Sequence, residues 1–306
     1  MNGSKIVMCA TTGLGLEILD HLAARGIRPQ HIVGISEETA RKNKVSGYVS
    51  FEKAAAKHGI PLYICKSYAL THEDDLAFFR EQKFDLLIQG GWQRLFPGPV
   101  LDTLRVGAVG IHGSSEFLPL GRGRSPINWS LIEGKKRFIF HYFVIRPGVD
   151  DGDVFHFDIV DINEWDSCET MYHKYAVVCK RAMADWIPRL LAGDFKALPQ
   201  TGEPSYYPKR TAEDGRIDWT KTVFELHNFV RALTRPYPGA FCLCGDKQLL
   251  IWEAQPFDTR ITYPDAAYGE VVEVFGNGEA VVNCRSGLLL LRDHEGAELR
   301  RGQLLT

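Results

Sequence analysis

The segment Phe84-Asp-Leu-Leu-Ile-Gln89 (FDLLIQ) decides the fold class of this chain. It is a short, nearly unbroken apolar run, which indicates a strand buried on both faces of a sheet. The residues before it, Glu73–Lys83, have the pattern of a helix, and the next predicted strand, Gly107–His112, is also apolar. This arrangement indicates a sheet whose strands are separated by helices.

The same alternation continues toward the N-terminus. The predicted strands there are Lys5–Ala10, His31–Ile35 and Pro61–Cys65, and the predicted helices are Leu16–Ala24 and Phe51–His58. Strands that alternate with helices predict an α/β fold with an open, mostly parallel, Rossmann-like sheet. In such a sheet, ligands bind beyond the carboxyl ends of the strands.

Two glycines, in Gly13-Leu-Gly15, follow the first predicted strand and raise the alternative of a dinucleotide-binding turn. That motif needs a third glycine where this chain has Ile18, and an acidic residue that would close a second strand is missing. We therefore interpret the two glycines as a tight turn that leads into a helix.

A second alternation occupies the middle of the chain. Strands are predicted at Phe138–Ile145 and Val154–Ile162, on either side of the polar turn Pro147–Asp153. Apolar residues then recur at helical spacing over Glu169–Gly193, which predicts one long helix. Pro188 is expected to kink or shorten the last turn of this helix.

The composition changes at Leu198–Thr211, a segment rich in Pro, Tyr and Gly that is typical of a linker. A helix is predicted at Thr222–Thr234, and short strands follow at Phe241–Leu243, Gln248–Ala254, Gly269–Phe275, Ala280–Cys284 and Leu288–Asp293. Closely spaced short strands indicate a small barrel or a β-sandwich, and we interpret them as a small β-rich, OB-like domain. We therefore predict an α/β domain over residues 1–205 and a β-barrel-like domain over residues 206–306.

Charge and cysteine content exclude several classes of protein. The net charge of −2 gives no whole-chain basic field for nucleic acid or an anionic membrane. The seven scattered cysteines do not form the framework of a disulfide-rich protein and fit a reducing compartment. Neither a signal peptide nor a membrane-spanning apolar run is recognisable. We expect a cytoplasmic protein without contact to a membrane.

The densest polar cluster runs from Gly110 to Trp129 and begins at the end of a predicted strand. His112 therefore lies where an α/β sheet places catalytic groups. The loop after it contains glycines, which allow close approach of a backbone, and arginines, which bind anions or planar rings. Pro126 suits the first turn of a helix. The alternative is a histidine that only caps a strand.

A second cluster, Arg146–Asp153, places three carboxylates in one turn between two apolar strands. It is either a simple polar turn or a carboxylate at a strand end that orients a histidine or accepts a proton. The spacing does not fit an EF-hand calcium loop, because no glutamate stands at the required distance. We expect no metal at this site.

These motifs resemble those of the tetrahydrofolate-dependent formyltransferases, whose pattern is Asn-x-His, Ser-Leu-Leu-Pro, Arg-Gly-x-x-Pro and Leu-Asp-x-Gly-Asp. The counterparts here are Gly110-Ile-His112, Ser114 with Leu118-Pro119, Arg122-Gly123-Arg-Ser-Pro126 and Val149-Asp150-Asp-Gly152-Asp153. The C-terminal part has further similar motifs, Tyr206–Thr211, Asp214-Gly, Ile217–Trp219 and Arg231–Phe241. The resemblance thus covers nearly the whole chain.

The resemblance implies an enzyme that transfers a formyl group from N10-formyltetrahydrofolate to an amine. His112 would stabilise the oxyanion, and Asp150 would take up or relay the amine proton. The residues implied for the folate donor are Trp92, Gln93, Arg94, Leu95, Arg122, Gly123, Ile145, Arg146, Gly148 and Asp150, and those for the acceptor are Ser114, Ser115, Glu116 and Arg124. The catalytic domain would be residues 1–205.

Two departures from the family pattern concern the reacting centre. Gly110 replaces the asparagine that helps to hold the formyl oxygen, and the loop between His112 and Pro119 is longer than usual. Losing one such donor typically costs a factor of about 10²–10³ in rate. The replacement candidates are Asn128, Ser114 and Ser115. Weakened turnover, or a protein that only binds folate or a nucleotide sugar, is the alternative.

The family includes enzymes that act on methionyl-tRNA and enzymes that act on nucleotide-linked amino sugars. The residues after Tyr206 carry 12 Lys and Arg against 14 Asp and Glu, and only Arg41-Lys42-Asn-Lys44 forms a small basic cluster. A tRNA enzyme needs a basic surface for phosphates. We therefore favour an amino sugar over nucleic acid, with a homodimer as a possible assembly through an exposed C-terminal strand.

Overall fold

The computed structural model describes residues 3–306. Its contacts divide the chain into two compact units. Unit 1 contains the residues up to Arg122 together with Ile139–Ile159 and His173–Tyr206, and unit 2 contains Gly123–Phe138, Val160–Tyr172 and Tyr207–Thr306. The domain boundary predicted at residue 206 stays a prediction.

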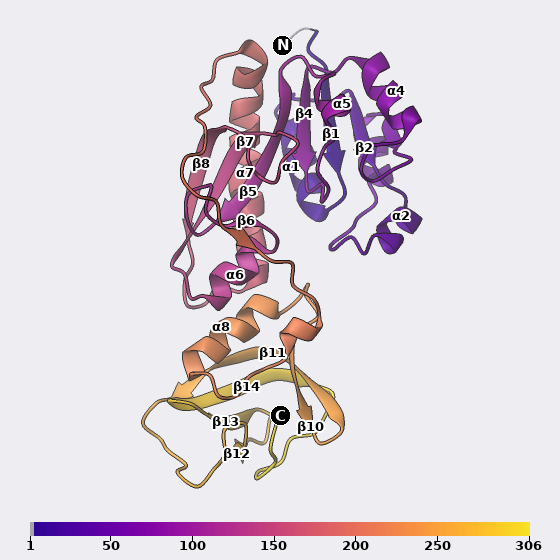
Figure 1. Cartoon of the computed structure of the whole chain (residues 1–306). Helices are drawn as coiled ribbons and strands as arrows, with labels where there is room; N and C mark the ends of the chain where they lie inside the picture. The colour runs from indigo at the N-terminus through magenta and orange to yellow at the C-terminus, as the bar shows by residue number, and fades with distance from the viewer. Residues whose placement is uncertain (1–2) are drawn as a thin grey trace. The chain divides into compact units, whose positions relative to one another are not determined.

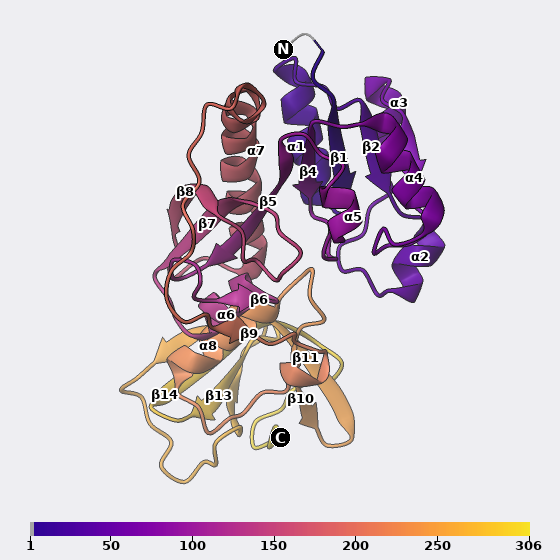
Figure 2. The same cartoon turned by 45° about the horizontal axis from the view of Figure 1, so that its top comes forward.

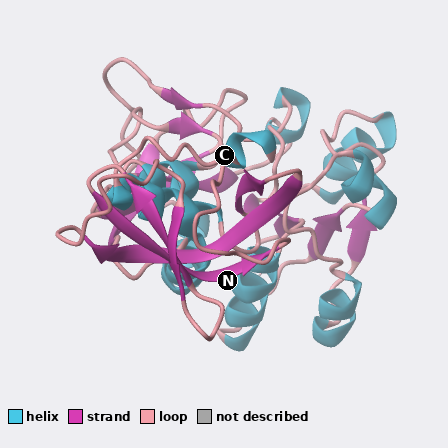
Figure 3. Ribbon diagram, turned by 90° about the horizontal axis from the view of Figure 1, so that it is seen from below, coloured by secondary structure: helices cyan, strands magenta, loops and turns pink. Residues whose placement is uncertain are grey.

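Within the described residues, the sheet of unit 1 has seven strands in the order β3-β2-β1-β4-β5-β7-β8. The strands are β1 (Ile6–Ala10), β2 (His31–Gly34), β3 (Leu62–Ile64), β4 (Leu86–Gly90), β5 (Gly107–Ser114), β7 (Arg137–Val144) and β8 (Val154–Asp161). The first five run parallel, and β7 is antiparallel to β5. The prediction of an open, mostly parallel sheet is confirmed, and its twist is visible from below in Figure 3.

Helices cover both faces of this sheet (Figures 1 and 2). On one face, α1 (Gly13–Ala24) lies beside α7 (Cys168–Ala192), where Lys180 Nζ is 3.3 Å from Glu17 Oε2. The helices that contribute to the other face include α4 (Glu73–Gln82) and α5 (Gly98–Leu101). The short helices α2 (Glu37–Lys42) and α3 (Glu52–His58) connect β2 to β3. Pro188 lies inside α7, which runs on to Ala192, so the last turn is not shortened there, and the kink stays a prediction.

Strand alternation determines which side chains share a face of the sheet. Val7 and Cys9 of β1, Leu87 of β4 and Ala108 of β5 belong to one core cluster, together with aromatic and aliphatic residues of α4 and α5 such as Phe79 and Val100. Two residues further along β4 and β5, at their carboxyl ends, the same face presents position 89 and position 110. At the carboxyl edge of the sheet, this face therefore ends with the polar side chain of Gln89 beside a glycine.

The turn into α1 is held by close packing. A Cβ added to Gly15 would lie 2.6 Å from the Gly90 carbonyl oxygen and 2.9 Å from Ala10 Cβ. Gly15 thus lets α1 approach β1 and β4 more closely than any side chain would permit. The interpretation of the two glycines as a turn that leads into a helix agrees with the start of α1 at Gly13.

Unit 2 contains an antiparallel sheet with the strand order β10-β11-β14-β13-β12. Its elements are α6 (Pro126–Ile132), a 3-10 turn (Glu213–Gly215), α8 (Val223–Leu233), β10 (Ala240–Cys244), β11 (Lys247–Asp258), β12 (Val271–Val274), β13 (Ala280–Cys284) and β14 (Gly287–Glu295). Thr222 and Glu225 form a capping box at the start of α8, which packs against α6 and β11. The predicted β-rich C-terminal region is confirmed.

Two short strands, β6 (Arg122–Gly123) and β9 (Tyr206–Tyr207), form a separate pair. In unit 2, a Cβ on Gly123 would lie 2.5 Å from the Tyr207 carbonyl oxygen, and Gly123 has a φ of +103°. Glycine is therefore required at this position.

Candidate active site

The carboxyl end of β5 brings His112 and Asp150 together. His112 Nδ1 lies 3.3 Å from Asp150 Oδ2, and His112 Nε2 lies 2.9 Å from the carbonyl oxygen of Gly121. The His112 side chain is 8% exposed and that of Asp150 is 22% exposed, so the pair is shielded but Asp150 still reaches solvent. Both residues belong to unit 1, and the sequence alone could not place them side by side.

Both ring nitrogens of His112 thus face oxygen acceptors. A neutral imidazole carries one N–H and can donate to only one of them. The contacts with Asp150 and with the Gly121 carbonyl oxygen together orient the imidazole in the site.

A second histidine, His141 of β7, contacts the backbone of His112 and of the loop that follows it. The register of β5 and β7 places His141 opposite His112, and His141 Nδ1 donates to the His112 carbonyl oxygen over 3.3 Å. His141 Nε2 accepts from the Leu118 backbone N–H, also at 3.3 Å. Burial, followed by the nearby His112, lowers the pKa of His141 to about 4. A neutral His141 thus ties the loop after β5 to the catalytic strand.

The loop that carries Asp150 is fixed by Gln200. Asp150 has a φ of +49°, in the left-handed region that side chains rarely adopt. Gln200 Nε2 donates to the carbonyl oxygens of Asp150 at 2.7 Å and of Gly152 at 2.8 Å. Gln200 Oε1 accepts from Arg122 Nη2 at 2.6 Å and from Arg122 Nε at 3.1 Å. Gln200 and Arg122 together hold the Asp150 loop in this conformation.

Close backbone contacts explain the glycine in the same turn. A Cβ on Gly152 would lie 1.7 Å from the Val144 carbonyl oxygen, so no side chain fits. Arg146 Nη2 forms an exposed ion pair with Asp153 Oδ2 at 2.7 Å, outside the cavity described next. Of the three carboxylates in the turn, Asp150 is the one that reaches His112.

A small cavity of about 40 Å³ opens beside Asp150. It is lined by Gln89, Arg94, Leu95, Phe96, Phe143, Ile145, Gly148 and Asp150. Five of these residues, Arg94, Leu95, Ile145, Gly148 and Asp150, are among those predicted for the folate donor. Its walls combine apolar side chains with a few polar groups.

Other residues predicted for the donor lie outside this lining. Trp92 is buried against Tyr68 and Phe96, and Gln93 donates through Nε2 to the Ser46 carbonyl oxygen. Arg94, which does line the cavity, lies over the Tyr68 ring at 5.0 Å and donates to Asn43. These contacts fix the segment that lines the cavity. The roles in binding stay predictions for Trp92, Gln93, Arg122, Gly123 and Arg146.

Of the residues predicted to bind the acceptor, two serines are buried in their own loop and one arginine is exposed. Ser114 is buried, donates to the Leu120 carbonyl oxygen at 3.0 Å and accepts from the Glu116 N–H, so it closes its own loop. Ser115 is also buried, whereas Arg124 of unit 2 is exposed. Acceptor binding by Ser114, Ser115, Glu116 and Arg124 stays a prediction.

Asn128, the predicted replacement for the family asparagine, lies in α6 of unit 2 and is buried. Its Nδ2 donates to the Ala232 carbonyl oxygen at 2.6 Å, and its side chain also hydrogen-bonds Tyr237. Its amide is thus engaged in packing α6 against α8. Oxyanion binding by Asn128 stays a prediction that these contacts do not favour.

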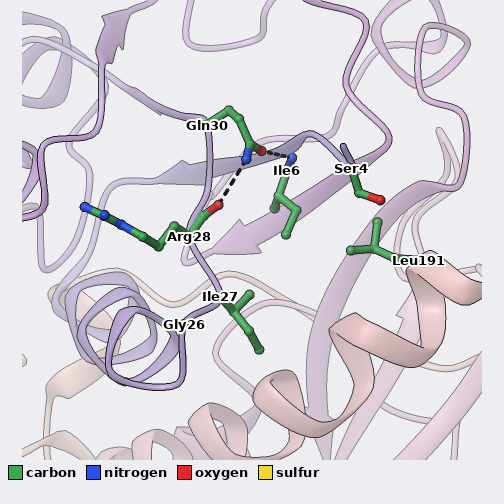
Figure 4. A pocket seen from close by; sticks show the side chains of 7 residues that line it. All are labelled: Ser4, Ile6, Gly26, Ile27, Arg28, Gln30 and Leu191. Carbon is green, nitrogen blue, oxygen red and sulfur yellow. Dashed lines mark hydrogen bonds between the residues drawn. The ribbon is translucent and has the colours of Figure 1, made fainter. Parts of the chain in front are cut away.

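A larger cavity, of about 170 Å³, lies at the opposite edge of the sheet (Figure 4). It is lined by Ser4, Ile6, Gly26, Ile27, Arg28, Gln30 and Leu191, around the start of β1. Gln30 bridges the Ile6 N–H and the Arg28 carbonyl oxygen there. This edge lacks an ionisable pair like that of His112 and Asp150 within its lining, so we place the active site at the smaller cavity.

Two further properties bear on the class of chemistry. Over residues 3–306, no group of three His, Cys, Asp or Glu side chains is placed to hold a metal ion. In the same range, no helix is long and apolar enough to cross a membrane. The seven cysteines are free thiols, and all except Cys244 are buried.

Sequence reasoning did not single out Gln89, His141, Gly121 or Gln200. Gln89 carried a signal, because it is the polar last residue of an otherwise apolar run at a carboxyl strand end. No sequence pattern indicated Gln200, since it lies in a segment whose composition is typical of a linker. His141 is one histidine in a buried strand, where a packing role is the default expectation.

Comparison with known proteins gives two family matches. The family described as "Formyl transferase" matches residues 11–187, and "Formyl transferase, C-terminal domain" matches residues 209–300. The methionyl-tRNA formyltransferase of Bacillus pumilus (strain SAFR-032) is 28% identical over 94% of this chain and 89% of its own length. That of Bacillus velezensis is 25% identical over 97% and 92%.

Solved structures share the fold at lower identity. The sugar 3N-formyl transferase WlaRD, in the presence of dTDP and 5-N-formyl-tetrahydrofolate, has a TM-score of 0.67 and 15% identity over 98% of this chain and 100% of that one. HypX from Aquifex aeolicus in complex with tetrahydrofolic acid has a TM-score of 0.65 and 18% identity over 98% of this chain and 46% of that one.

Proposed function

Because this chain belongs to the formyl transferase family, we propose that it transfers the formyl group of N10-formyltetrahydrofolate to the amine of a nucleotide-linked amino sugar. The observation that carries the chemistry is the 3.3 Å approach of His112 to Asp150 beside the cavity. The fold neighbours that hold a tetrahydrofolate compound support the choice of donor.

The proposed mechanism uses His112 and Asp150 in different roles. The acceptor amine attacks the formyl carbon, and the carbonyl oxygen takes up negative charge. His112 donates a hydrogen bond to this oxygen, exchanging the Gly121 carbonyl for it, while Asp150 accepts the amine proton. When the bond from the formyl carbon to N10 breaks, the pair returns a proton to N10. The products are the formamide and tetrahydrofolate.

Charge supports an amino sugar as the acceptor. The residues after Tyr206 carry 12 basic and 14 acidic side chains, which gives no net attraction for phosphates. A tRNA would need several Lys and Arg contacts to its backbone. Among the solved neighbours, a Helicobacter canadensis N-formyltransferase was determined in complex with folinic acid and dTDP-3-aminofucose.

Methionyl-tRNA is the second candidate, since the Bacillus relatives that match over nearly the full chain bear that name. The discriminating measurement is electrophoretic retention of methionyl-tRNA over a range of salt concentrations. Tight retention that falls steeply with salt, together with formylation of the bound tRNA, would reverse our choice.

The product assay tests the function itself. The protein is incubated with N10-formyltetrahydrofolate alone, with dTDP-linked and UDP-linked amino sugars, and with methionyl-tRNA, and tetrahydrofolate release is followed. Release that requires an amino sugar supports the proposal. Release without any amine indicates a hydrolase, and no release under any condition indicates a folate-binding protein.

A further inference from the structure

Gly110 stands where the family pattern has an asparagine, and the space that an asparagine side chain would need is already occupied. A Cβ built on Gly110 would lie 3.0 Å from Ile145 Cδ1 and Cγ1 and 3.3 Å from Gln89 Oε1. Distances this short already crowd the neighbours, and a whole asparagine would need more room still. The volume in front of Gly110 is therefore taken by the Ile145 side chain and the amide of Gln89.

Strand register explains how Gln89 reaches this position. The parallel pair of β4 and β5 matches Leu87 with Ala108 and Ile88 with Val109, so Gln89 comes next to Gly110. Leu87 and Ala108 lie in the same core cluster, and side chains alternate along a strand. Gln89 therefore projects from the same face of the sheet as position 110 and as His112, and it lines the cavity with Asp150.

The hydrogen bonds of Gln89 fix the orientation of its amide. Nε2 donates to the Trp92 carbonyl oxygen at 2.8 Å, and Oε1 faces the Ile111 N–H at 3.4 Å. A primary amide has a second N–H, and no hydrogen bond from it to an acceptor is found among residues 3–306. By contrast, each ring nitrogen of His112 already faces an oxygen. Gln89 is thus a preorganised donor beside the cavity, and it can bind a further oxygen without giving up either of its existing hydrogen bonds.

We propose that Gln89 replaces the family asparagine as a catalytic residue: its free N–H binds the formyl oxygen and is strongest as charge develops there. This inference rests on the proposed formyl transfer at the same cavity. Gln89 forms no covalent bond and transfers no proton. Its hydrogen bond strengthens when the amine adds to the formyl carbon and weakens again when the N10–carbon bond breaks.

The first test compares matched glutamine variants. Gln89→Leu removes the donor at similar size, and Gln89→Glu keeps the shape but replaces the N–H groups by an acceptor. Gln30→Leu is the control, because Gln30 also bridges two backbone groups but at the opposite edge of the sheet (Figure 4). We expect kcat to fall about 10²–10³-fold in both Gln89 variants and to stay within about twofold in the control.

The kinetic signature separates a catalytic role from a structural one. Loss of an interaction made mainly in the transition state lowers kcat and kcat/KM together. If Gln89 only holds the loop through Trp92, its loss would instead raise KM for the donor or lower the melting temperature, with kcat retained at saturation. That pattern, or a Gln89→Leu kcat within about threefold of wild type, overturns the proposal.

A relocated donor gives a positive test. In the double variant Gln89→Ala with Gly110→Asn, truncation of Gln89 makes room for an asparagine, and the flexible Ile145 tip is the remaining contact. We expect this variant to recover at least about tenfold in kcat over Gln89→Ala. A double variant that folds, binds the donor and recovers nothing contradicts the placement of the donor beside position 110.

A spectroscopic measurement does not depend on turnover. N10-formyltetrahydrofolate with a ¹³C-labelled formyl group is bound without any amine, and the infrared carbonyl stretch is compared between wild type and Gln89→Leu. A bound stretch that moves to higher frequency in the variant supports the hydrogen bond, and an unchanged stretch overturns it. A wild type that binds but does not transfer would refute the proposed function while leaving this result readable.

Discussion

His112 Nδ1 and Asp150 Oδ2 lie 3.3 Å apart, although the two residues are far apart in the chain. β5 supplies the histidine, and the turn between β7 and β8 supplies the carboxylate. β7 runs antiparallel to β5 and ends with Val144 opposite Val109, so the turn that carries Asp150 begins beside the strand that carries His112.

The pair should behave as one unit when it is mutated. We expect kcat for formyl transfer to fall about 10²–10⁴-fold in His112→Ala and in Asp150→Asn. Asparagine is the better replacement for Asp150, because it tolerates the φ of +49° that alanine would strain. The double variant should be little slower than the worse single variant. Near-wild-type rates in either single variant would refute the assigned roles.

Gln200 should position Asp150 without touching the substrate. Gln200→Glu keeps an acceptor for Arg122 but places oxygens against the Asp150 and Gly152 carbonyls, so we expect a lower kcat and a loss of about 1–3 kcal/mol of stability. The measurement is kcat over pH together with chemical denaturation. A positioning role should change how kcat depends on pH, whereas a pH profile that keeps its shape would argue for a purely structural role. Gln255→Glu, on β11, is the control.

His141 should make stability depend on pH. Its pKa is about 4 when folded and about 6.5 when unfolded. Between these values the unfolded chain binds a proton that the folded protein does not, so stability falls as pH drops from 6.5 to 4. The full effect is about 3 kcal/mol. The difference in unfolding free energy between wild type and His141→Gln, measured by denaturation at several pH values, should shrink toward pH 4; a constant difference contradicts this assignment.

The two glycines before α1 should respond in opposite ways to alanine. Gly13 starts the helix with open space around its Cβ position, so Gly13→Ala should stabilise the protein by about 0.5–1 kcal/mol. Gly15→Ala places a methyl group 2.6 Å from the Gly90 carbonyl oxygen and should cost more than about 2 kcal/mol. Thermal melting of both variants checks the pair, and equal shifts would contradict the packing argument.

Several features of the fold could be predicted because they depend on local pattern. The apolar runs at β1, β4 and β5 and the helical spacing of α7 gave these elements nearly their observed bounds. α2 and α5 were not predicted, since Glu37–Lys42 and Gly98–Leu101 are too short for a periodic signal. α7 continues past Pro188 to Ala192, because tertiary packing can hold a helix together past a proline.

The periodicity and order of the residues are enough to predict the layered α/β fold, the β-rich C-terminal region, and a histidine and a carboxylate at strand ends. Three contacts come from the folded chain alone: Gln200 holds Asp150, His141 pairs with His112 across the strands, and Gln89 occupies the space in front of Gly110. Those contacts join residues on different strands and loops. Their geometry depends on sheet register and on loop closure, which no local pattern encodes.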